Sequence, residues 1–341
     1  MEYNATSDLW YQYFNADGPQ WLILLGVYGF RALWATLGIC FDFGIVYITV
    51  KSKSLRSICN ILIAMESAFA LILNNGYYVS FLVVLSGIKF IRYEYCFWYL
   101  IVPSLFGDLC QMTMVLTGAD RLCAVAMPIW YQQRKIKQYL AIVAVFLCCF
   151  AIYDFVILYS DYIFTKNIMI SCAPNDIGLG PFGPIMNFKT FTLSAVIVAL
   201  YTLCWFFVFK FTATSQNVTE NNRKLIKSLL FIIGLNLIGV AAKSVIKFIF
   251  QYFMVVNVFL KTSNSIAFSF LTITVYSANT PVLYIVSTEY RARFNQHLPM
   301  LTILFQQKIG ANTSATANIV APTATVSRPW VNHYNANVDV R

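Results

Sequence analysis

The sequence predicts an all-α membrane protein with seven transmembrane helices, and two observations carry this prediction. The 341 residues are 59% hydrophobic and only 11% charged, with a mean hydropathy of +0.66, whereas soluble domains carry about 25% charged residues. Seven apolar runs follow one another, each long enough to cross a hydrocarbon core of about 30 Å. They cover about residues 21–50, 58–87, 95–124, 138–160, 187–211, 225–254 and 263–287. Backbone groups in lipid must be satisfied within their own segment, so these runs are expected to be helices.

The first 20 residues are polar and aromatic and contain no Lys or Arg. A cleaved signal peptide has a basic start followed by a short apolar core. We therefore expect residues 1–20 to persist as a tail, and the first apolar run to direct insertion. Asn4-Ala5-Thr6 is a glycosylation sequon, so Asn4 is expected to be glycosylated if this tail lies outside the cell.

The basic residues of the short loops predict the orientation, because cytoplasmic loops carry an excess of Lys and Arg. Most lie in the first, third and fifth loops and after the last run: Lys51, Lys53, Arg56, Arg134, Lys135, Lys137, Lys210, Arg223, Lys224, Arg291, Arg293 and Lys308. The opposite side has Lys89, Arg92, Lys166, Lys189 and Lys261. This moderate bias places the N-terminus outside. It also explains the net charge of +10 without a nucleic-acid partner.

The segment after the seventh run alternates basic and aromatic residues at helical spacing over residues 288–298. This pattern is typical of a short amphipathic helix on a membrane surface. From about residue 310 the chain is rich in Ala, Thr, Asn and Pro, a composition that favours disorder. We therefore expect an extracellular tail over 1–20, a membrane domain over 21–298 that includes an eighth helix, and a cytoplasmic tail over 299–341.

A series of short motifs carries a resemblance to a known family. The motifs are Lys-Ser-Lys-Ser-Leu-Arg-Ser at 51–57, Cys96-Phe97-Trp98, Gly118-Ala119-Asp120-Arg121-Leu122, Pro128-Ile129-Trp130-Tyr131, Ser171-Cys172-Ala173-Pro174 and Ser277-Ala278-Asn279 before Pro281. In this order and spacing, the chain resembles a rhodopsin-like G-protein-coupled receptor. It is more closely similar to a nematode serpentine chemoreceptor of the Srsx type, over roughly residues 36–295.

The resemblance implies roles for both ends of the third run. Cys96 and Cys172 are expected to form a disulfide on the oxidising, outer side. Asp120 and Arg121 are expected at the inner end, where the arginine would hold the inactive state and then contact the C-terminal helix of a G protein. An arginine at this depth can also snorkel to the headgroups with no further role. Pro128 and Tyr131 would shape the second inner loop.

The chain departs from the general receptor pattern in its seventh run. The family motif Asn-Pro-x-x-Tyr is represented by Asn279, Pro281 and Tyr284, with Thr280 inserted before the proline. A shift of one residue along a helix turns the side-chain direction by about 100°. The sequence therefore does not predict whether Asn279 makes the polar contacts of the motif's asparagine. Pro281 removes one backbone hydrogen bond and is expected to kink the helix.

Two acids lie deep inside the predicted spans. Asp42 is nine residues before Lys51 and Glu66 is ten after Arg56, which places both about 13–15 Å from the membrane face. Rhodopsin-like receptors, which the chain resembles, have an Asn and an Asp at the positions of Asp42 and Ala70. Intramembrane acids are functional candidates by default. We hypothesise that Asp42, Glu66 and Asn279 form one polar cluster; hydrogen bonding of each acid to the backbone is the alternative.

Candidate ligand-binding residues are weaker predictions. Tyr99, Pro103 and Phe106 lie on the outer half of the third run, and Pro103 stands where the resemblance places the aspartate of amine receptors. Lys243 and Lys247 are four residues apart in the sixth run and either face a ligand cavity or snorkel outward.

Together these observations favour a plasma-membrane receptor for an odorant or pheromone-like small molecule, signalling through a heterotrimeric G protein. The ciliary membrane of sensory neurons is one expected location, and lipid is the surrounding partner. A peptide or neuromodulator receptor of the same fold is the alternative; an odorant-gated channel or a transporter has less support. Thr274 occupies the place of the retinal-binding lysine in opsins, which argues against a photoreceptor. No metal site, cofactor or enzymatic activity is expected.

Overall fold

The structure is a computed structural model, and it describes residues 20–174, 177–178, 180–214, 258–299 and the single positions 234, 238, 239, 241, 242 and 245. The chain divides into the units Met1–Pro299 and Met300–Arg341, and the second unit lies outside the described residues. So do Asn4 and most of the predicted sixth run, including Lys243 and Lys247.

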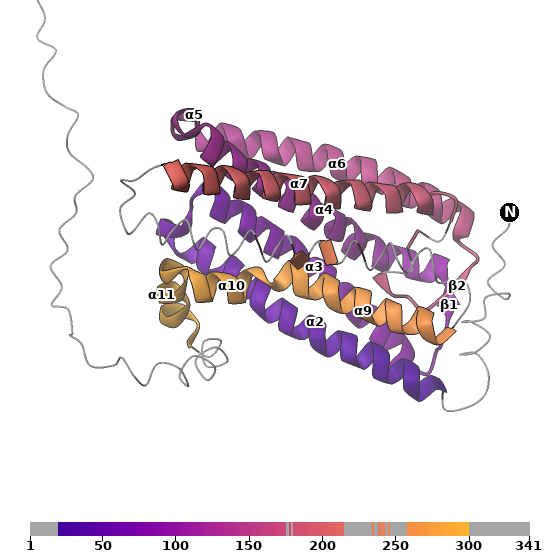
Figure 1. The fold of residues 1–341 in the computed structure, drawn as a ribbon. Helices are drawn as coiled ribbons and strands as arrows, with labels where there is room; N and C mark the ends of the chain where they lie inside the picture. Colours follow the sequence, from indigo (N-terminus) through magenta and orange to yellow (C-terminus); the bar gives the residue numbers. More distant parts are fainter. Residues whose placement is uncertain are drawn as a thin grey trace, which may run out of the picture. The chain divides into compact units, whose positions relative to one another are not determined.

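Long helices lie side by side along one direction (Figure 1). Five are long and apolar enough to cross a membrane, namely α2 (Gln20–Lys51), α3 (Ile58–Leu85), α4 (Tyr93–Ala126), α6 (Ile136–Thr165) and α7 (Gly183–Thr214). The helices α9 (Val258–Ser277) and α10 (Asn279–Val286) form a pair bent by 41° that adds a sixth span. These elements coincide with the first five predicted runs and the seventh.

The boundary before the seventh run differs from the prediction. The seventh run was predicted to begin at residue 263, but α9 already begins at Val258. Lys261 and Thr262 therefore belong to the first turns of a helix. Polar residues are tolerated there because the ends of a spanning helix lie near the headgroups.

The bend between α9 and α10 lies just before Pro281, as the missing amide of a proline predicts. Elsewhere the turns between helices are closed by local hydrogen bonds. Ser57 caps α3 by accepting a hydrogen bond from the amide of Asn60 at 3.4 Å. Arg56 donates to the carbonyl of Val50, at the end of α2, at 2.6 Å. The connection of six residues between them contains the short helix η2 (Lys53–Leu55).

The helix α4 is central, since it packs against α3, α6 and α7. The core among α3, α4, α7 and α9 contains Ala70, Met114, Ile197, Tyr201 and Val275. Large apolar side chains also cover the outside of the bundle; examples are Leu33, Ile142, Phe188 and Phe209. This distribution suits a protein whose outer surface faces lipid.

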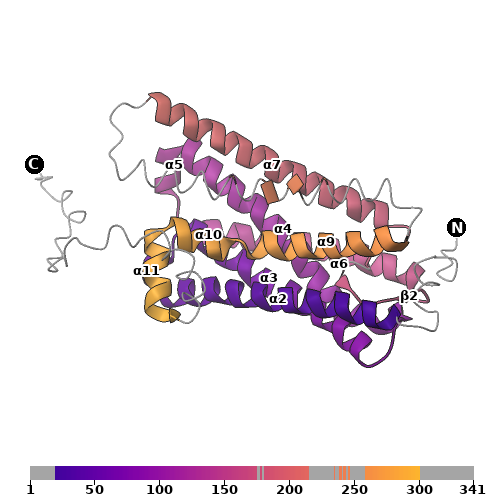
Figure 2. The same cartoon turned by 60° about the horizontal axis from the view of Figure 1, so that its bottom comes forward.

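A short helix, α11 (Thr288–His297), follows α10 and lies across the end of the bundle (Figure 2). Ser287 caps it by accepting a hydrogen bond from the amide of Tyr290. Tyr290 and Phe294 are 3% and 0% exposed and face the bundle. The close approach of Phe294 needs Gly44 of α2, because a Cβ there would lie 3.1 Å from the Phe294 ring. The helix matches the one predicted over 288–298.

Candidate functional sites

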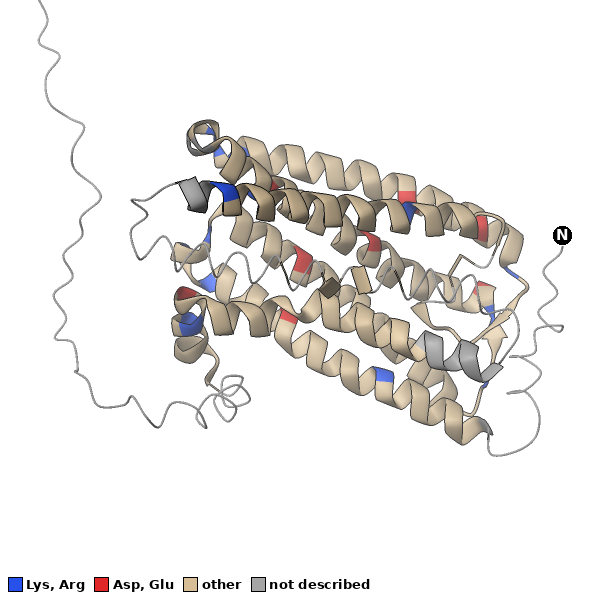
Figure 3. Ribbon diagram, in the orientation of Figure 1, with Lys and Arg blue, Asp and Glu red and all other residues tan. Residues whose placement is uncertain are grey.

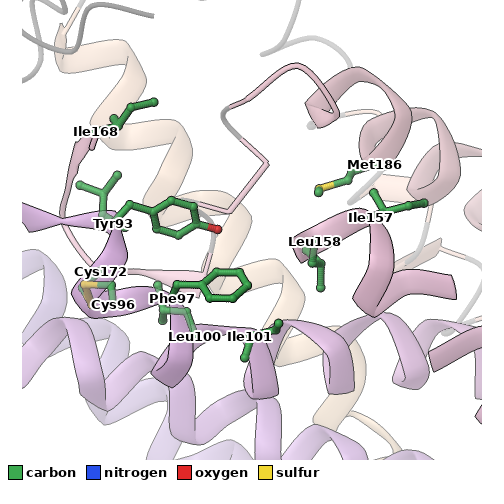
Figure 4. Packing of buried hydrophobic residues seen from close by; sticks show 11 residues of the cluster. Tyr93, Cys96, Phe97, Leu100, Ile101, Ile157, Leu158, Ile168, Cys172 and Met186 are labelled. Carbon is green, nitrogen blue, oxygen red and sulfur yellow. A yellow bond between two sulfur atoms is a disulfide. The ribbon is translucent and has the colours of Figure 1, made fainter. Parts of the chain in front are cut away.

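The bundle has two ends, which we name by their residues. At the disulfide end, Cys96 in the first turn of α4 is bonded to Cys172, with the Cα atoms 5.6 Å apart. The strand β1 (Ile91–Arg92) precedes α4 and pairs antiparallel with β2 (Met169–Ile170). This pairing brings the two cysteines together. Beside them, Tyr93, Phe97 and other apolar side chains form a buried cluster (Figure 4).

The segment that follows the disulfide is buried rather than exposed. Ser171, Cys172 and Ala173 are each at most 2% exposed. Pro174 reaches α3 and α4, since a Cβ on Gly76 would lie 3.0 Å from Pro174 Cγ and 2.6 Å from Pro103 Cβ. The segment therefore covers part of the disulfide end of the bundle, directly beside Pro103.

A cluster of three charged residues joins three helices in the half of the bundle nearer this end. Lys189 of α7 donates to Asp108 of α4 at 2.7 Å and to Asp154 of α6. The side chains of Lys189 and Asp154 are 9% and 0% exposed, whereas that of Asp108 is 21% exposed. Figure 3 shows that charged residues occur along the length of the bundle as well as at its ends. We call Lys189, Asp108 and Asp154 the three-ion cluster.

The three-ion cluster corrects the sequence analysis, which assigned Lys189 to an outer loop. Lys189 lies inside α7, six residues after its first residue, Gly183. Removing it from the loop count increases the charge bias between the two sides. Charges at this depth are costly unless they are paired, and Lys189 has two carboxylate partners.

Polar contacts extend from this cluster along the same two helices. Gln111 of α4 donates to the Ser194 hydroxyl at 2.8 Å and to the Thr190 carbonyl at 3.0 Å, both on α7. Gln111 is 3% exposed and Ser194 is 3% exposed. The buried side-chain amide of Gln111 thus donates to two acceptors on α7. Because a buried amide needs such partners, these bonds favour one relative position of α4 and α7.

The two intramembrane acids predicted from the sequence lie in the middle of the bundle, and each contacts the region around the bend before Pro281. Asp42 accepts hydrogen bonds from Ser277 at 2.8 Å and from Asn74 at 3.3 Å. Glu66 accepts one from Asn279 at 2.9 Å. All five residues are at most 4% exposed. The structure thus brings α2, α3 and the start of α10 together through side chains.

We call Asp42, Glu66, Asn74, Ser277 and Asn279 the central polar cluster. Its packing requires a glycine in α2 and the bend between α9 and α10. A Cβ on Gly38 would lie 2.8 Å from both Asn74 Nδ2 and Ser277 Oγ. Thr280, inserted before the proline, donates to the carbonyl of Phe41 at 2.6 Å. Asn279, which lies one residue earlier than the asparagine of the family motif, donates its hydrogen bond to Glu66. The sequence analysis did not assign Asn74 and Ser277 to the cluster, because which uncharged polar side chains face an acid depends on how the helices pack.

At the other end, which we call the arginine end, Asp120 of α4 is 0% exposed. It accepts hydrogen bonds from the Tyr131 hydroxyl at 3.0 Å and from Arg134 at 2.6 Å. Both partners follow α4 in the connection to α6. The short helix α5 (Pro128–Gln133) carries Tyr131, and Pro128 at its first position starts that helix.

Arg134 is held between two aromatic rings. Its Cζ lies 3.6 Å from the ring centroid of Tyr131 and 4.1 Å from that of Tyr139. Burial alone would lower the pKa of Arg134, but the hydrogen bond and charge of Asp120 raise it. Burial and the same carboxylate raise the pKa of Tyr131, so its phenol keeps the proton that it donates. Asp120, Tyr131, Arg134 and Tyr139 are called the loop latch below.

Arg121 does not take part in the loop latch. Among the described residues, the ion pair of Asp120 is with Arg134 and not with Arg121. The charge of Arg121 still interacts with Asp120 and Tyr131, and also with Cys59 of α3 and Tyr201 of α7.

Tyr284 of α10 is held by the short helix that follows it. Its hydroxyl donates to Asn295 at 3.1 Å, and its ring packs edge-to-face on Phe294. Arg291 donates to the carbonyls of Tyr284 and Ile285, which end the helix α10. The predicted switch residues therefore lie in two different places: Asn279 is part of the central polar cluster, and Tyr284 packs against α11.

The predicted ligand-binding residues have different surroundings. Phe106 is half-buried and packs edge-to-face on Phe69, and Pro103 is buried. Tyr99 is 69% exposed and belongs to an exposed stripe with Tyr95, Trp98 and Val102. Tyr99 therefore lies on an exposed side of α4, and its role in ligand binding stays a prediction. In the described part of the chain, no three His, Cys, Asp or Glu side chains converge as metal ligands would.

A family model described as the serpentine type 7TM GPCR chemoreceptor Srsx matches residues 35–298. The chain belongs to this family. The crystal structure of squid rhodopsin resembles the receptor with a TM-score of 0.63 and 14% sequence identity, covering 90% of this chain and 95% of that chain. This likeness shows the seven-helix fold. No curated protein matches the sequence.

Membership confirms the resemblance found in the motifs, and with it the rhodopsin-like fold. Sequence reasoning missed the three-ion cluster. Asp108, Asp154 and Lys189 all lie inside predicted runs, but nothing in the sequence connected them. The signal available was the presence of Asp and Lys inside three successive apolar runs, since buried charges need partners.

Proposed function

We propose that the receptor lies in the plasma membrane with its N-terminus outside, binds a small chemosensory molecule near the disulfide end and activates a heterotrimeric G protein at the arginine end. The Lys and Arg bias of the loops supports this orientation, and the family description supports a chemosensory role. A ligand acts here by favouring one of two arrangements of the helices, without chemistry.

The observation that carries the proposal is the loop latch. An acid that is 0% exposed is bound by an arginine and a tyrosine from a connection between helices, and Arg121 lies next to it. When a partner displaces this connection, Asp120 loses both donors and the contacts around Arg121 change. Signalling across the membrane then amounts to a shift between a latched and an open arginine end.

The disulfide half of the bundle offers the contacts for a ligand. Asp108 and Gln111 lie about one turn apart on α4 and both contact α7, while Phe106 packs on Phe69 of α3. Asp108 is the member of the three-ion cluster that keeps 21% exposure. The buried segment Ser171–Ala173 covers α3 and α4 above them. The family description, serpentine chemoreceptor, supports a small chemosensory ligand over a peptide.

The test is a screen of small volatile and water-soluble molecules with G-protein activation as the readout. A ligand that activates the wild-type receptor should fail with Arg121→Ala at equal surface expression. Activation that survives in Arg121→Ala would remove Arg121 from coupling. A ligand-gated current in membranes without G protein would instead favour the channel alternative.

The orientation has its own test. Glycosylation of Asn4, measured as a mass shift on glycosidase treatment and lost in Asn4→Gln, places the N-terminus outside. An N-terminal epitope that stains only permeabilised cells would contradict the proposed topology and, with it, the receptor.

A further inference from the structure

The arginine end carries a basic surface that neither the loop latch nor Arg121 uses. Three of its residues, Lys51, Lys53 and Arg56, lie at the end of α2 and around η2 and are exposed. The fourth, Arg293, is on α11 and half-buried. Among the described residues, no carboxylate forms an ion pair with any of the four. We call these four residues the basic surface.

The two segments that carry the basic surface touch each other. Arg293 Nη2 lies 3.5 Å from the Ser54 hydroxyl of η2. Leu55 anchors η2 and Phe294 anchors α11, and both side chains are 0% exposed. The positive charges are therefore gathered before any partner binds, so little ordering is required on binding.

The position of the basic surface matches the level of lipid headgroups. Lys51 is the last residue of a spanning helix, and the residue before it, Val50, is apolar and 65% exposed. The Lys51 ammonium donates to the Tyr47 hydroxyl at 2.8 Å. Tyrosine and lysine next to an exposed apolar residue are typical of the boundary between hydrocarbon and headgroups.

We propose that η2 and α11 together form a binding site for the headgroup of a phosphoinositide. Four cations and the Ser54 hydroxyl on two fixed segments suit a headgroup with several phosphates, whereas a headgroup with one net charge would engage only part of them. Glu289 is the one acid on these segments and is exposed. The lipid would hold α11 against η2 and thereby support Tyr284, which α11 binds through Asn295. The site lies in the inner leaflet if the proposed orientation holds.

The test uses the full-length receptor in nanodiscs of phosphatidylcholine that contain either phosphatidylinositol 4,5-bisphosphate or phosphatidylserine at equal total charge. Lipid retained by the receptor is measured by native mass spectrometry. The double variant Lys53→Gln/Arg293→Gln removes one cation from each segment and leaves the buried anchors in place. The control, Lys135→Gln/Lys137→Gln, removes two exposed basic residues from the start of α6.

The wild type and the control should retain the phosphoinositide in preference to phosphatidylserine. The double variant should bind it about 25-fold more weakly, because one basic residue near an anionic surface changes binding about fivefold. Equal retention of the two lipids, or an equal loss in the control, would overturn the site. Equal retention combined with weaker G-protein activation by the double variant would overturn it and assign the surface to a protein partner.

This test separates the site from the proposed function. A nanodisc presents the same lipid on both of its faces, so the result does not depend on the orientation in cells. The proposed orientation is tested by a different experiment, and an N-terminal epitope on the cytoplasmic side would contradict it.

Discussion

The receptor has two buried ion clusters with similar chemistry and different supports. In the three-ion cluster, Lys189 and its two carboxylates come from the spanning helices α4, α6 and α7. In the loop latch, Asp120 of α4 is paired with Arg134, which follows a helix of six residues. The acids Asp154 and Asp120 are both 0% exposed. The clusters therefore differ in what must move to open them rather than in burial.

Opening the three-ion cluster requires whole helices to separate and leaves charges at a depth where water is scarce, which is costly. Opening the loop latch requires only that a short connection moves. That connection presents Ile129 and Trp130, which are 75% and 52% exposed, and a helix of six residues has little stability of its own. Arg134 would then move toward water or headgroups. The comparison suggests an anchor near the middle of α4, at Asp108, and a releasable contact near its end, at Asp120.

The largest expected effect is at the anchor. Lys189→Ala leaves the buried carboxylate of Asp154 and the partly buried one of Asp108 without their cation. This should destabilise the receptor by about 3–5 kcal/mol and prevent surface expression. Surface expression measured by flow cytometry, and thermal unfolding of purified protein, check this prediction. Adding Asp108→Asn and Asp154→Asn to Lys189→Ala should restore expression, because no buried charge remains. Normal expression of Lys189→Ala alone would remove the distinction between the two clusters.

The second prediction concerns the latch. Arg134→Ala should leave surface expression near that of the wild type and raise basal G-protein activation by roughly 5-fold or more, the lower end of typical coupling energies. Lys135→Ala changes the neighbouring exposed residue and should leave basal activation unchanged. Arg134→Lys should be intermediate, because lysine keeps the charge but cannot stack between Tyr131 and Tyr139 in the same way. If Arg134→Ala instead destabilised the receptor as strongly as Lys189→Ala, both clusters would be anchors.

The helices of this comparison were predictable and their partners were not. Hydropathy is a local property of each run, so α2, α3, α4, α6 and α7 were located within a few residues. The contact of Lys189 with two other helices depends on how the helices rotate and pack, which periodicity in one run does not reveal. Lys189 therefore read as a loop residue, although it lies inside a predicted run.

The same reasoning explains the outcome at the arginine end. The spacing of Asp120, Pro128 and Tyr131 pointed to the second loop through the family resemblance. Arg134 counted only toward the charge bias, since a basic residue in a loop usually needs no partner. Its burial between two tyrosines results from the geometry of the connection, and no single-sequence pattern encodes it.

The smallest expected effect lies between the two clusters, where Glu66 and Asn279 connect α3 with the start of α10. If this contact transmits the state of one end of α4 to the other, Glu66→Gln and Asn279→Ala should not act independently. In a double-mutant cycle, basal activation and thermal stability should show a coupling of about 0.5–3 kcal/mol, the range for residues in contact. Gln keeps an acceptor for the Asn279 amide, so Glu66→Gln should shift activity more than stability. Thr202 is exposed, and among the described residues its hydroxyl donates to the carbonyl of Val198 in the same helix, α7. Thr202→Ala combined with Asn279→Ala therefore gives the matched pair without contact. Additive effects in the Glu66–Asn279 cycle, equal to those of this control pair, would mean that the anchor and the latch open independently of the central polar cluster.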